Sequence, residues 1–508
     1  MTYSRSVLAY IIFYATTLFN SKGRNPFRLG FLLAFYVIPA FSAEYETRGN
    51  TEMVYLGSKN VDLDVQFSLI RAATSIDFVG YSQTIDLYGE PFMQAVHAAQ
   101  KNNGAKVRFV YDRSLSMDKN DLFNQVKAII SDPSLPCRGE ALCAHPIEKL
   151  SSGIGFLDYV HHKITILNLG KPDEVVLMGF GRGKTANSAG WIDSSVAFRR
   201  INPNLPYVGD DIQAMFDSVY KALGKLADQS WIRIPRQVKR GSTLLPESSP
   251  KTFSITSIEK QHTAELLALL RTPAILTPAS ELKPFQFQPK GVKAMSNDLF
   301  QQLVDHRGKN RDTYVNDNQR IMNAEIREFN GTIDWTSYSY GPTDGTHQAL
   351  VDFVNRGNTL NLYLNGPVAF KVAMDSEFAM PYTYESVGRL IKEIKPESGG
   401  KVNLYVLNPQ RNPEMLEAPY IHRRMVVFSN EKTKFVYAGS DPLTWSAAHK
   451  NDENLFLIED VRFGKYMMDV TSSELSHFDL LTHEETLHFD ANRPWKYLCL
   501  RSLVRKFF

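Results

Sequence analysis

Hydrophobic positions follow the same succession of periods in two separate stretches of this chain. In the first stretch, a stripe with helical spacing begins at Leu63 and leads into the alternating, strand-like run Ser75–Tyr81. A second helical pattern ends at Gly104 and leads into another strand-like run, Lys106–Tyr111. The order helix, strand, helix, strand predicts an α/β arrangement for this half of the chain.

The second stretch repeats that order. A helical stripe from Met322 precedes the strand-like run Thr332–Tyr338, and a short helical pattern over Gln348–Arg356 precedes the run Leu360–Leu364. A repeat of this length is typical of two related lobes and not of a solenoid. The pattern therefore predicts two similar lobes, each a mixed β-sheet flanked by helices.

Each stretch then continues into a β-branched run that carries a histidine two residues before a cation. The first run, YVHHKITIL, contains His161 and Lys163, and the second, YIHRRMVVF, contains His422 and Arg424. Side chains two apart on a strand share a face, so we expect each histidine to point the same way as its cation. A cation binds phosphate oxygens, and an imidazole can attack phosphorus or move a proton. The two pairs predict one phosphodiester site built from two halves. His162, which lies between His161 and Lys163, is expected to face away from this site and to have a packing role.

Small and polar residues follow each histidine run, after one further apolar strand. Thr185 and Asn187 lie in the first half, and Ser440 lies in the second, where Asn451-Asp452-Glu453 comes next. Hydroxyl, amide and carboxylate groups at these points can orient the histidines and donate to a phosphate. Glu453 is the candidate to orient a histidine, and Thr185, Asn187 and Ser440 are the supporting candidates.

With these residues the chain resembles the phospholipase D superfamily, whose pattern is H-x-K-x4-D followed by G-S/G-x-N and often N-x-E. The resemblance covers about Asn60 to Asp460, in both halves. Several pattern residues are replaced: the two aspartates by Asn168 and Ser429, the second lysine by Arg424, the second asparagine by Pro442, and the first N-x-E by a segment with Asp193 and Ser195. Arginine keeps the positive charge and adds a bidentate fork, and the tyrosyl-DNA phosphodiesterase branch also lacks the aspartates.

The resemblance implies a fold of two phospholipase D-like lobes with the active site at their interface, and a reaction through a covalent phosphohistidine. We assign His161 as the nucleophile, because its motif keeps the lysine, and His422 as general acid and base. The reverse assignment stays open at this point. Lys163 and Arg424 neutralise the non-bridging oxygens, so no metal or other cofactor is expected.

Composition narrows the choice of substrate class only slightly. The chain has 508 residues, 43% hydrophobic and 22% charged, which is typical of a globular protein, and its net charge of +3 suits an anionic substrate. An aromatic content of 12% and an aromatic, basic C-terminal tail favour a phospholipid at a membrane surface as the partner. The alternatives are a nuclease-like enzyme that cuts DNA or RNA and a catalytically impaired binding relative. No protein partner is implied.

The first 43 residues form a region of their own. Two apolar runs, 7–19 and 29–38, are separated by basic residues and followed by small residues, which predicts a signal peptide or membrane anchor and an extracytoplasmic or secreted protein. In such an oxidising compartment, Cys137 and Cys143 are expected to form a disulfide. The predicted organisation continues with an N-terminal lobe over 44–230, a connector over 231–315 and a C-terminal lobe over 316–508.

Overall fold

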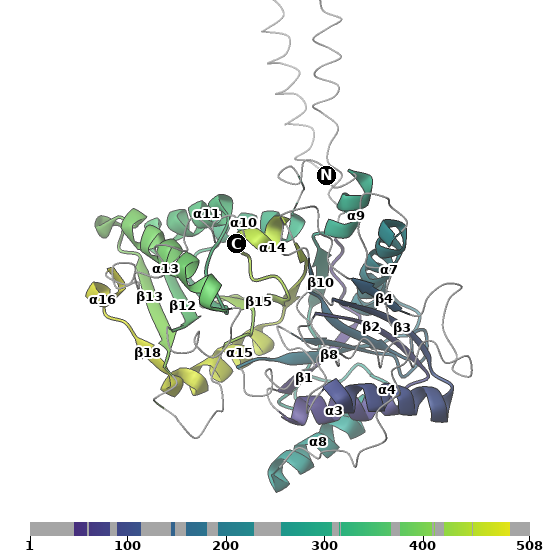
Figure 1. Ribbon diagram of the computed structural model, residues 1–508. Helices are drawn as coiled ribbons and strands as arrows, with labels where there is room; N and C mark the ends of the chain where they lie inside the picture. Colours follow the sequence, from purple (N-terminus) through teal and green to yellow (C-terminus); the bar gives the residue numbers. More distant parts are fainter. Residues whose placement is uncertain are drawn as a thin grey trace, which may run out of the picture. The chain divides into compact units, whose positions relative to one another are not determined.

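The computed structural model of this chain describes residues 45–57, 60–81, 89–112, 144–147, 159–179, 192–227, 256–306, 314, 316–366, 376–408, 411, 421–449 and 451–487. All elements named below belong to the unit Glu46–Phe508 (Figure 1). The predicted disulfide of Cys137 and Cys143, the candidates Thr185 and Asn187, and the apolar runs before residue 45 lie outside the described residues. Within the described ranges, no helix combines the length and apolar character needed to cross a membrane.

A mixed β-sheet forms the core of the N-terminal half. Its described strands are β1 (Thr51–Gly57), β2 (Ser75–Tyr81), β3 (Lys106–Asp112), β4 (Ala144–Ile147), β6 (Lys163–Leu167), β7 (Val175–Gly179), β8 (Ser195–Arg200) and β9 (Gln286–Phe287). They are ordered β4-β3-β2-β6-β7-β8-β1-β9. Strands β2, β3 and β4 run parallel, and the remaining neighbours are antiparallel.

A second mixed sheet forms the core of the C-terminal half. Its described strands are β10 (Gly291–Ser296), β11 (Thr332–Thr336), β12 (Thr359–Asn365), β13 (Lys401–Leu407), β14 (Met425–Ser429), β15 (Lys434–Gly439), β17 (Asn454–Glu459) and β18 (Phe478–Leu480). The order β10-β17-β15-β14-β11-β12-β13-β18 matches the first sheet strand for strand, from β1 and β10 to β4 and β13. The predicted repeat of two similar α/β lobes is therefore confirmed. Strands β9 and β10, both within the predicted connector, add one strand to each sheet.

Helices flank both sheets (Figure 1). The described α-helices are α3 (Asn60–Ala72), α4 (Gly89–Asn103), α7 (Val208–Ala227), α8 (Ser257–Leu270), α9 (Leu299–Asp305), α10 (Asp317–Glu328), α11 (Asp344–Asn355), α13 (Ser376–Glu393), α14 (Trp445–His449), α15 (Val461–Glu474) and α16 (His483–Leu487), with 3-10 turns at Pro396–Ser398 and Leu475–His477. Helix α3 contacts α4 and α8, and α10 contacts α11. The helix ends predicted at Gly104 and Gly357 are confirmed, because both residues adopt positive φ, +62° and +91°, which glycine does at little steric cost.

The apolar core continues from one half of the chain into the other. The predicted stripe of α3, Leu63, Phe67 and Ile70, is buried. Between the sheets, Phe198 of β8 stacks on Phe456 of β17 with ring centroids 5.8 Å apart. Because one cluster of buried residues includes side chains from both sheets, the two lobes share a core.

The histidine segments depart from the predicted continuous strands. Strand β5 (Tyr159–Val160) pairs in parallel with β16 (Asn451–Asp452) from the other half, and β6 begins only at Lys163. In the C-terminal half, Ile421 likewise bridges to Ile192, and β14 begins only at Met425. Each histidine therefore lies at a break, where the backbone passes from pairing with the opposite lobe to pairing within its own sheet. The expectation of a regular strand through each histidine is therefore wrong, although the side chains of His422 and Arg424 still meet, with Nε2 and Nη2 3.2 Å apart.

Candidate active site

Two histidines are each paired with a carboxylate from the opposite half of the chain. His161 Nδ1 lies 2.7 Å and 2.9 Å from the two carboxylate oxygens of Glu453, and His422 Nδ1 lies 3.2 Å from Asp193 Oδ2. The side chains of Glu453 and Asp193 are fully buried, while that of His422 is 13% exposed. Each lobe thus supplies the carboxylate for the histidine of the other, so neither of these two pairs is complete within one lobe.

Backbone pairing between the lobes sets this exchange. The amide of His161 donates to Asp452 O at 2.9 Å, and the amide of His422 donates to Ile192 O at 3.0 Å. In both cases the carboxylate belongs to the residue after the acceptor: Glu453 follows Asp452, and Asp193 follows Ile192. Asp193 is therefore the counterpart of Glu453, and the N-x-E motif of the first half aligns with 191–193, not with 193–195. Sequence reasoning missed Asp193 as a site residue, because only this backbone pairing between the lobes makes its position equivalent to that of Glu453.

Arg424 lies between the two imidazoles. Its Nη2 is 3.4 Å from His161 Nε2 and 3.2 Å from His422 Nε2. Because a guanidinium only donates hydrogen bonds, both Nε2 atoms act as acceptors, and the ring proton of each neutral imidazole is on Nδ1, facing its carboxylate. The guanidinium carbon lies 5.0 Å from the ring centroid of Tyr338, a distance suited to a cation–π contact. Arg424 thus helps to set the tautomer in which each Nε2 carries the electron pair and each Nδ1 the proton.

The second cation, Lys163, is anchored to the same segment. Its Nζ donates to the carbonyl oxygen of His161 at 2.6 Å. Burial, reinforced by Arg424, lowers the pKa of Lys163 well below its ordinary value. Burial, Lys163 and Arg424 lower the pKa of His161 in the same way, and burial and Arg424 lower the pKa of His422 to about 4. An incoming anion would offset the desolvation and the repulsion among these cations, so the site is suited electrostatically to a phosphate.

Several hydrogen bonds hold Glu453 in place. Ser440 Oγ donates to Oε2 at 2.6 Å, Asn451 Nδ2 donates to Oε1 at 3.1 Å, and the amide of Glu453 donates to Asn297 Oδ1 at 2.9 Å. Burial and then the nearby carboxyl of Asp441 raise the pKa of Glu453 to about 8. Glu453 therefore takes up a proton readily. The structure brings Glu453 to His161 and the supporting candidate Ser440 to Glu453.

The residues between each histidine and its cation point to separate partners. His162 Nε2 lies 2.6 Å from Asp452 Oδ1, both groups being buried, and Arg423 pairs with Glu474. His162 therefore packs in a buried hydrogen-bonded pair with Asp452 and does not join His161. This placement agrees with the packing role predicted for it.

Asn365 fixes the backbone next to His422. Its Nδ2 donates to Ile421 O at 2.8 Å and to Tyr338 O at 2.9 Å, and its Oδ1 accepts from the amide of Ile421 at 2.7 Å. The side chain is fully buried. Asn365 thereby ties the end of β12 to the histidine segment, a role that the sequence did not reveal.

The replaced aspartates lie away from the histidines. Asn168 follows the end of β6, and its Oδ1 accepts from the amide of Thr74 at 2.7 Å, so it closes a turn at the far end of the strand. Ser429 is the last residue of β14. Both replacements therefore leave the histidine pairs intact. The described ranges contain no group of three histidine, cysteine or acidic side chains that could hold a metal ion.

Comparison with solved structures confirms the fold. A phosphatidylserine synthase from Haemophilus influenzae is similar over 89% of this chain and 93% of its own, with 11% identity and a TM-score of 0.56. Two further structures match. A polyphosphate kinase from Porphyromonas gingivalis is similar over 90% of this chain and 56% of its own, with 11% identity and a TM-score of 0.40. The phospholipase D family member Nuc from Salmonella typhimurium is similar over 32% of this chain and 90% of its own, with 18% identity and a TM-score of 0.23. No protein-family model and no curated protein sequence matches the chain. This chain therefore shares the two-lobe, mixed-sheet fold of the phosphatidylserine synthase over most of its length.

Proposed function

We propose that this protein is a phospholipase D-like phosphodiesterase that hydrolyses a phospholipid headgroup ester through a phosphohistidine. The observation that carries the proposal is the convergence of two imidazole Nε2 atoms on one guanidinium nitrogen, each imidazole being supported from behind by a carboxylate. Two opposed imidazoles beside two cations form a site for an anion that is attacked on one side and loses its leaving group on the other.

The reaction proceeds in two displacements. Nε2 of His161 attacks phosphorus, so the P–N bond forms as the P–O bond to the leaving alcohol breaks, and His422 in its protonated form gives its proton to that oxygen. His422 then takes a proton from water, whose oxygen attacks phosphorus and breaks the P–N bond. Glu453 stabilises the charge that develops on His161. Asp193 offsets part of the lowering of the His422 pKa that burial and Arg424 cause, and so favours the protonated acid.

A phospholipid is the proposed substrate, and a membrane surface the proposed place of action. An aromatic content of 12% supports the choice, as does the fold shared with an enzyme named for a phospholipid product. The N-terminal segment 1–43, as a signal peptide or anchor, supports an extracytoplasmic location in this proposal. The alternative function is that of a nuclease, and the experiments below distinguish it from lipid hydrolysis.

The roles of the two histidines are tested with bis(p-nitrophenyl) phosphate. Because p-nitrophenolate leaves without a proton, the first step needs the nucleophile but not the acid. We expect His422→Asn to release about one equivalent of p-nitrophenolate and to accumulate an acid-labile phosphoenzyme, since the second step lacks its base. We expect His161→Asn to give neither the burst nor the phosphoenzyme. The opposite pattern would reverse the assignment, and full activity in both variants would refute the mechanism.

The substrate class is tested by incubating the purified protein with labelled phosphatidylcholine and with single- and double-stranded DNA, with and without EDTA. Lipid turnover that survives chelation is the expected result, because Lys163 and Arg424 supply the positive charge. Cleavage of DNA alone would support the nuclease. Inactivity on both, in a folded protein, would support a binding role.

A further inference from the structure

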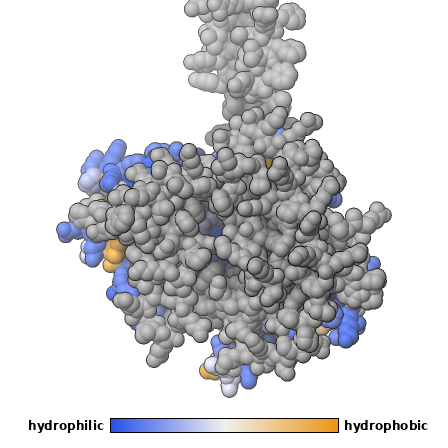
Figure 2. All heavy atoms as spheres, viewed as in Figure 1, coloured by the Kyte–Doolittle hydropathy of each residue, from blue (hydrophilic) through white to orange (hydrophobic). Residues whose placement is uncertain are grey.

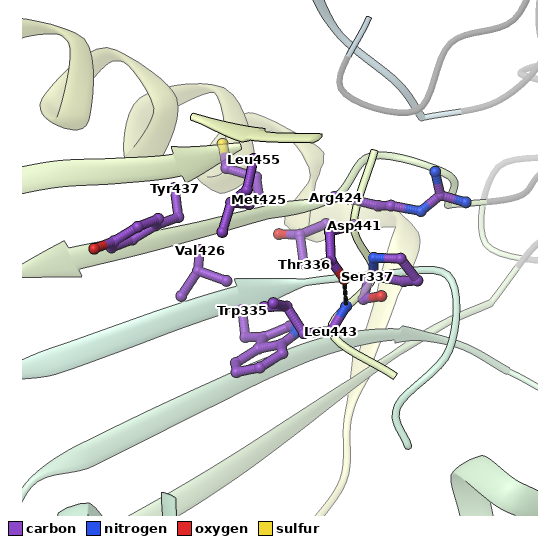
Figure 3. A pocket seen from close by; sticks show the side chains of 11 residues that line it. Trp335, Thr336, Ser337, Arg424, Met425, Val426, Tyr437, Asp441, Leu443 and Leu455 are labelled. Atoms are coloured by element: carbon purple, nitrogen blue, oxygen red, sulfur yellow. Dashed lines mark hydrogen bonds between the residues drawn. The ribbon is translucent and has the colours of Figure 1, made fainter. Parts of the chain in front are cut away.

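A small pocket lies beside Arg424 in the C-terminal lobe. It has room for about one water-sized group. Figure 3 shows Thr336, Ser337 and Asp441 gathered near Arg424, while Trp335 and other apolar side chains line the opposite part. Pro442, which stands where the superfamily pattern has asparagine, also lines the pocket. The polar end therefore adjoins the cation that contacts both histidines.

Several buried polar atoms at this end have unused hydrogen-bonding capacity. Among the described residues, none pairs with Thr336 Oγ1, Ser337 Oγ, or the Nε and Nη1 atoms of Arg424. These side chains belong to residues that are only 1% to 4% exposed. Since a buried polar group without a partner costs about 1–3 kcal/mol, such a cluster indicates a place where a ligand supplies the partners.

Arg424 and Asp441 are both held in place at the polar end of this pocket. Asp441 accepts from the amide of Leu443 at 2.6 Å and from Asn318 Nδ2 at 3.2 Å, and Arg424 is fixed by the two histidines. Figure 3 marks the bond to Leu443 with a dashed line. The donors of Arg424 and the acceptor of Asp441 are thus arranged around the pocket in advance of ligand binding.

The balance of donors and acceptors selects the ligand. Burial raises the pKa of Asp441 to about 6, so at pH 7.5 its carboxylate is an acceptor. A phosphoryl oxygen has no proton to give and would be repelled by this carboxylate. A hydroxyl group can accept from Arg424 or Ser337 and donate to Asp441 at the same time.

We propose that this pocket binds a hydroxyl group of the substrate, carried next to the cleaved ester on a polyol headgroup, with Ser337 and Asp441 as its specificity-determining residues. This inference rests on the proposed function, because it places the hydroxyl relative to a phosphoryl group held between His161 and His422. Glycerol is the simplest headgroup of this class.

The test compares phosphatidylglycerol with phosphatidylpropanol, which has the same acyl chains and a headgroup of the same length without hydroxyls, in mixed micelles at pH 7.5. Wild-type protein is expected to prefer phosphatidylglycerol in kcat/KM by about 10- to 100-fold, the range for one hydrogen bond to a charged group. Ser337→Ala and Asp441→Asn are expected to reduce the preference to about 3-fold or less, chiefly by slowing phosphatidylglycerol cleavage. Tyr340→Phe is the matched control, since it removes a buried, unpaired hydroxyl outside the pocket and should retain the preference.

Equal wild-type rates on the two lipids would overturn the inference and leave the proposed function standing. If neither lipid is cleaved but bis(p-nitrophenyl) phosphate is, the lipid substrate fails, and the same comparison is made with the dinucleotides UpU and dTpdT. A preference for UpU that Ser337→Ala removes would then support the hydroxyl site with a ribonucleotide as its source. Equal rates on the two dinucleotides would overturn it.

Discussion

Replacing Glu453 with glutamine tests the mechanism and the electrostatics of the site together. The change keeps the size of the side chain but removes the charge that faces His161 Nδ1 at 2.7 Å and 2.9 Å. The single Nδ1–H, which the two oxygens of an ionised carboxylate share, then faces a neutral amide. Because His161 becomes positively charged in the transition state, the change removes one partner of a buried ion pair, which costs about 3–5 kcal/mol and corresponds to about 10²- to 10⁴-fold in kcat.

The same substitution should change stability in the opposite direction. The folded protein raises the pKa of Glu453 from an ordinary 4.5 to about 8, so between these pH values the folded state binds more protons than the unfolded state. This contribution to stability is fully present below pH 4.5 and is lost as the pH rises through 8. Glutamine carries no charge to bury, so the Glu453→Gln variant should show a smaller fall in Tm between pH 5 and pH 8.5 than the wild type.

The assay combines single-turnover cleavage of bis(p-nitrophenyl) phosphate at pH 9, where Glu453 of the wild type is ionised, with thermal unfolding across the range from pH 5 to pH 8.5. Asp452→Asn is the matched control, because Asp452 is equally buried and pairs with His162, away from the reaction centre. It should lower Tm while keeping the rate within about 10-fold of the wild type below its transition. The reasoning is refuted if Glu453→Gln reacts at the wild-type rate, or if both variants lose the same amount of activity.

The pH profile of kcat/KM should be bell-shaped, because the reaction needs His422 protonated and Glu453, the partner of His161, ionised, and their pKa values of about 4 and about 8 set the two limbs. Initial rates from pH 3 to 10 check this profile. If Glu453→Gln leaves the limb near pH 8 unchanged, the assignment of that limb is wrong. Asn365→Ala leaves both backbone groups of Ile421 unpaired, so we expect a loss of about 3 kcal/mol in denaturant titrations and a lower kcat at temperatures where the variant stays folded. Phe456→Ala removes the ring that stacks between the sheets and should cost about 3–5 kcal/mol, with both lobes losing structure in one transition; separate transitions would show that the lobes do not share a core.

Local sequence patterns were sufficient to predict the repeat and to identify the candidate catalytic residues. Helical stripes and alternating runs fixed the positions of α3, β2, α10 and β11, because burial of one face imposes its period on the sequence. The spacing of histidine and cation identified His161, Lys163, His422 and Arg424 without knowledge of the fold. These features depend on residues close in sequence, which is why they could be read from it.

The sequence by itself determined that two equivalent halves exist and which histidines and cations they contribute. Only the tertiary structure decided how these groups are combined. Each histidine lies at a break in its strand, paired with the other lobe, and its carboxylate comes from about 230 or 290 residues away. Asp193 acquired its role only through that crossing, because no local pattern records which segment pairs with Ile421. Packing between the lobes, and not the spacing within either, therefore creates the site and the pocket beside Arg424.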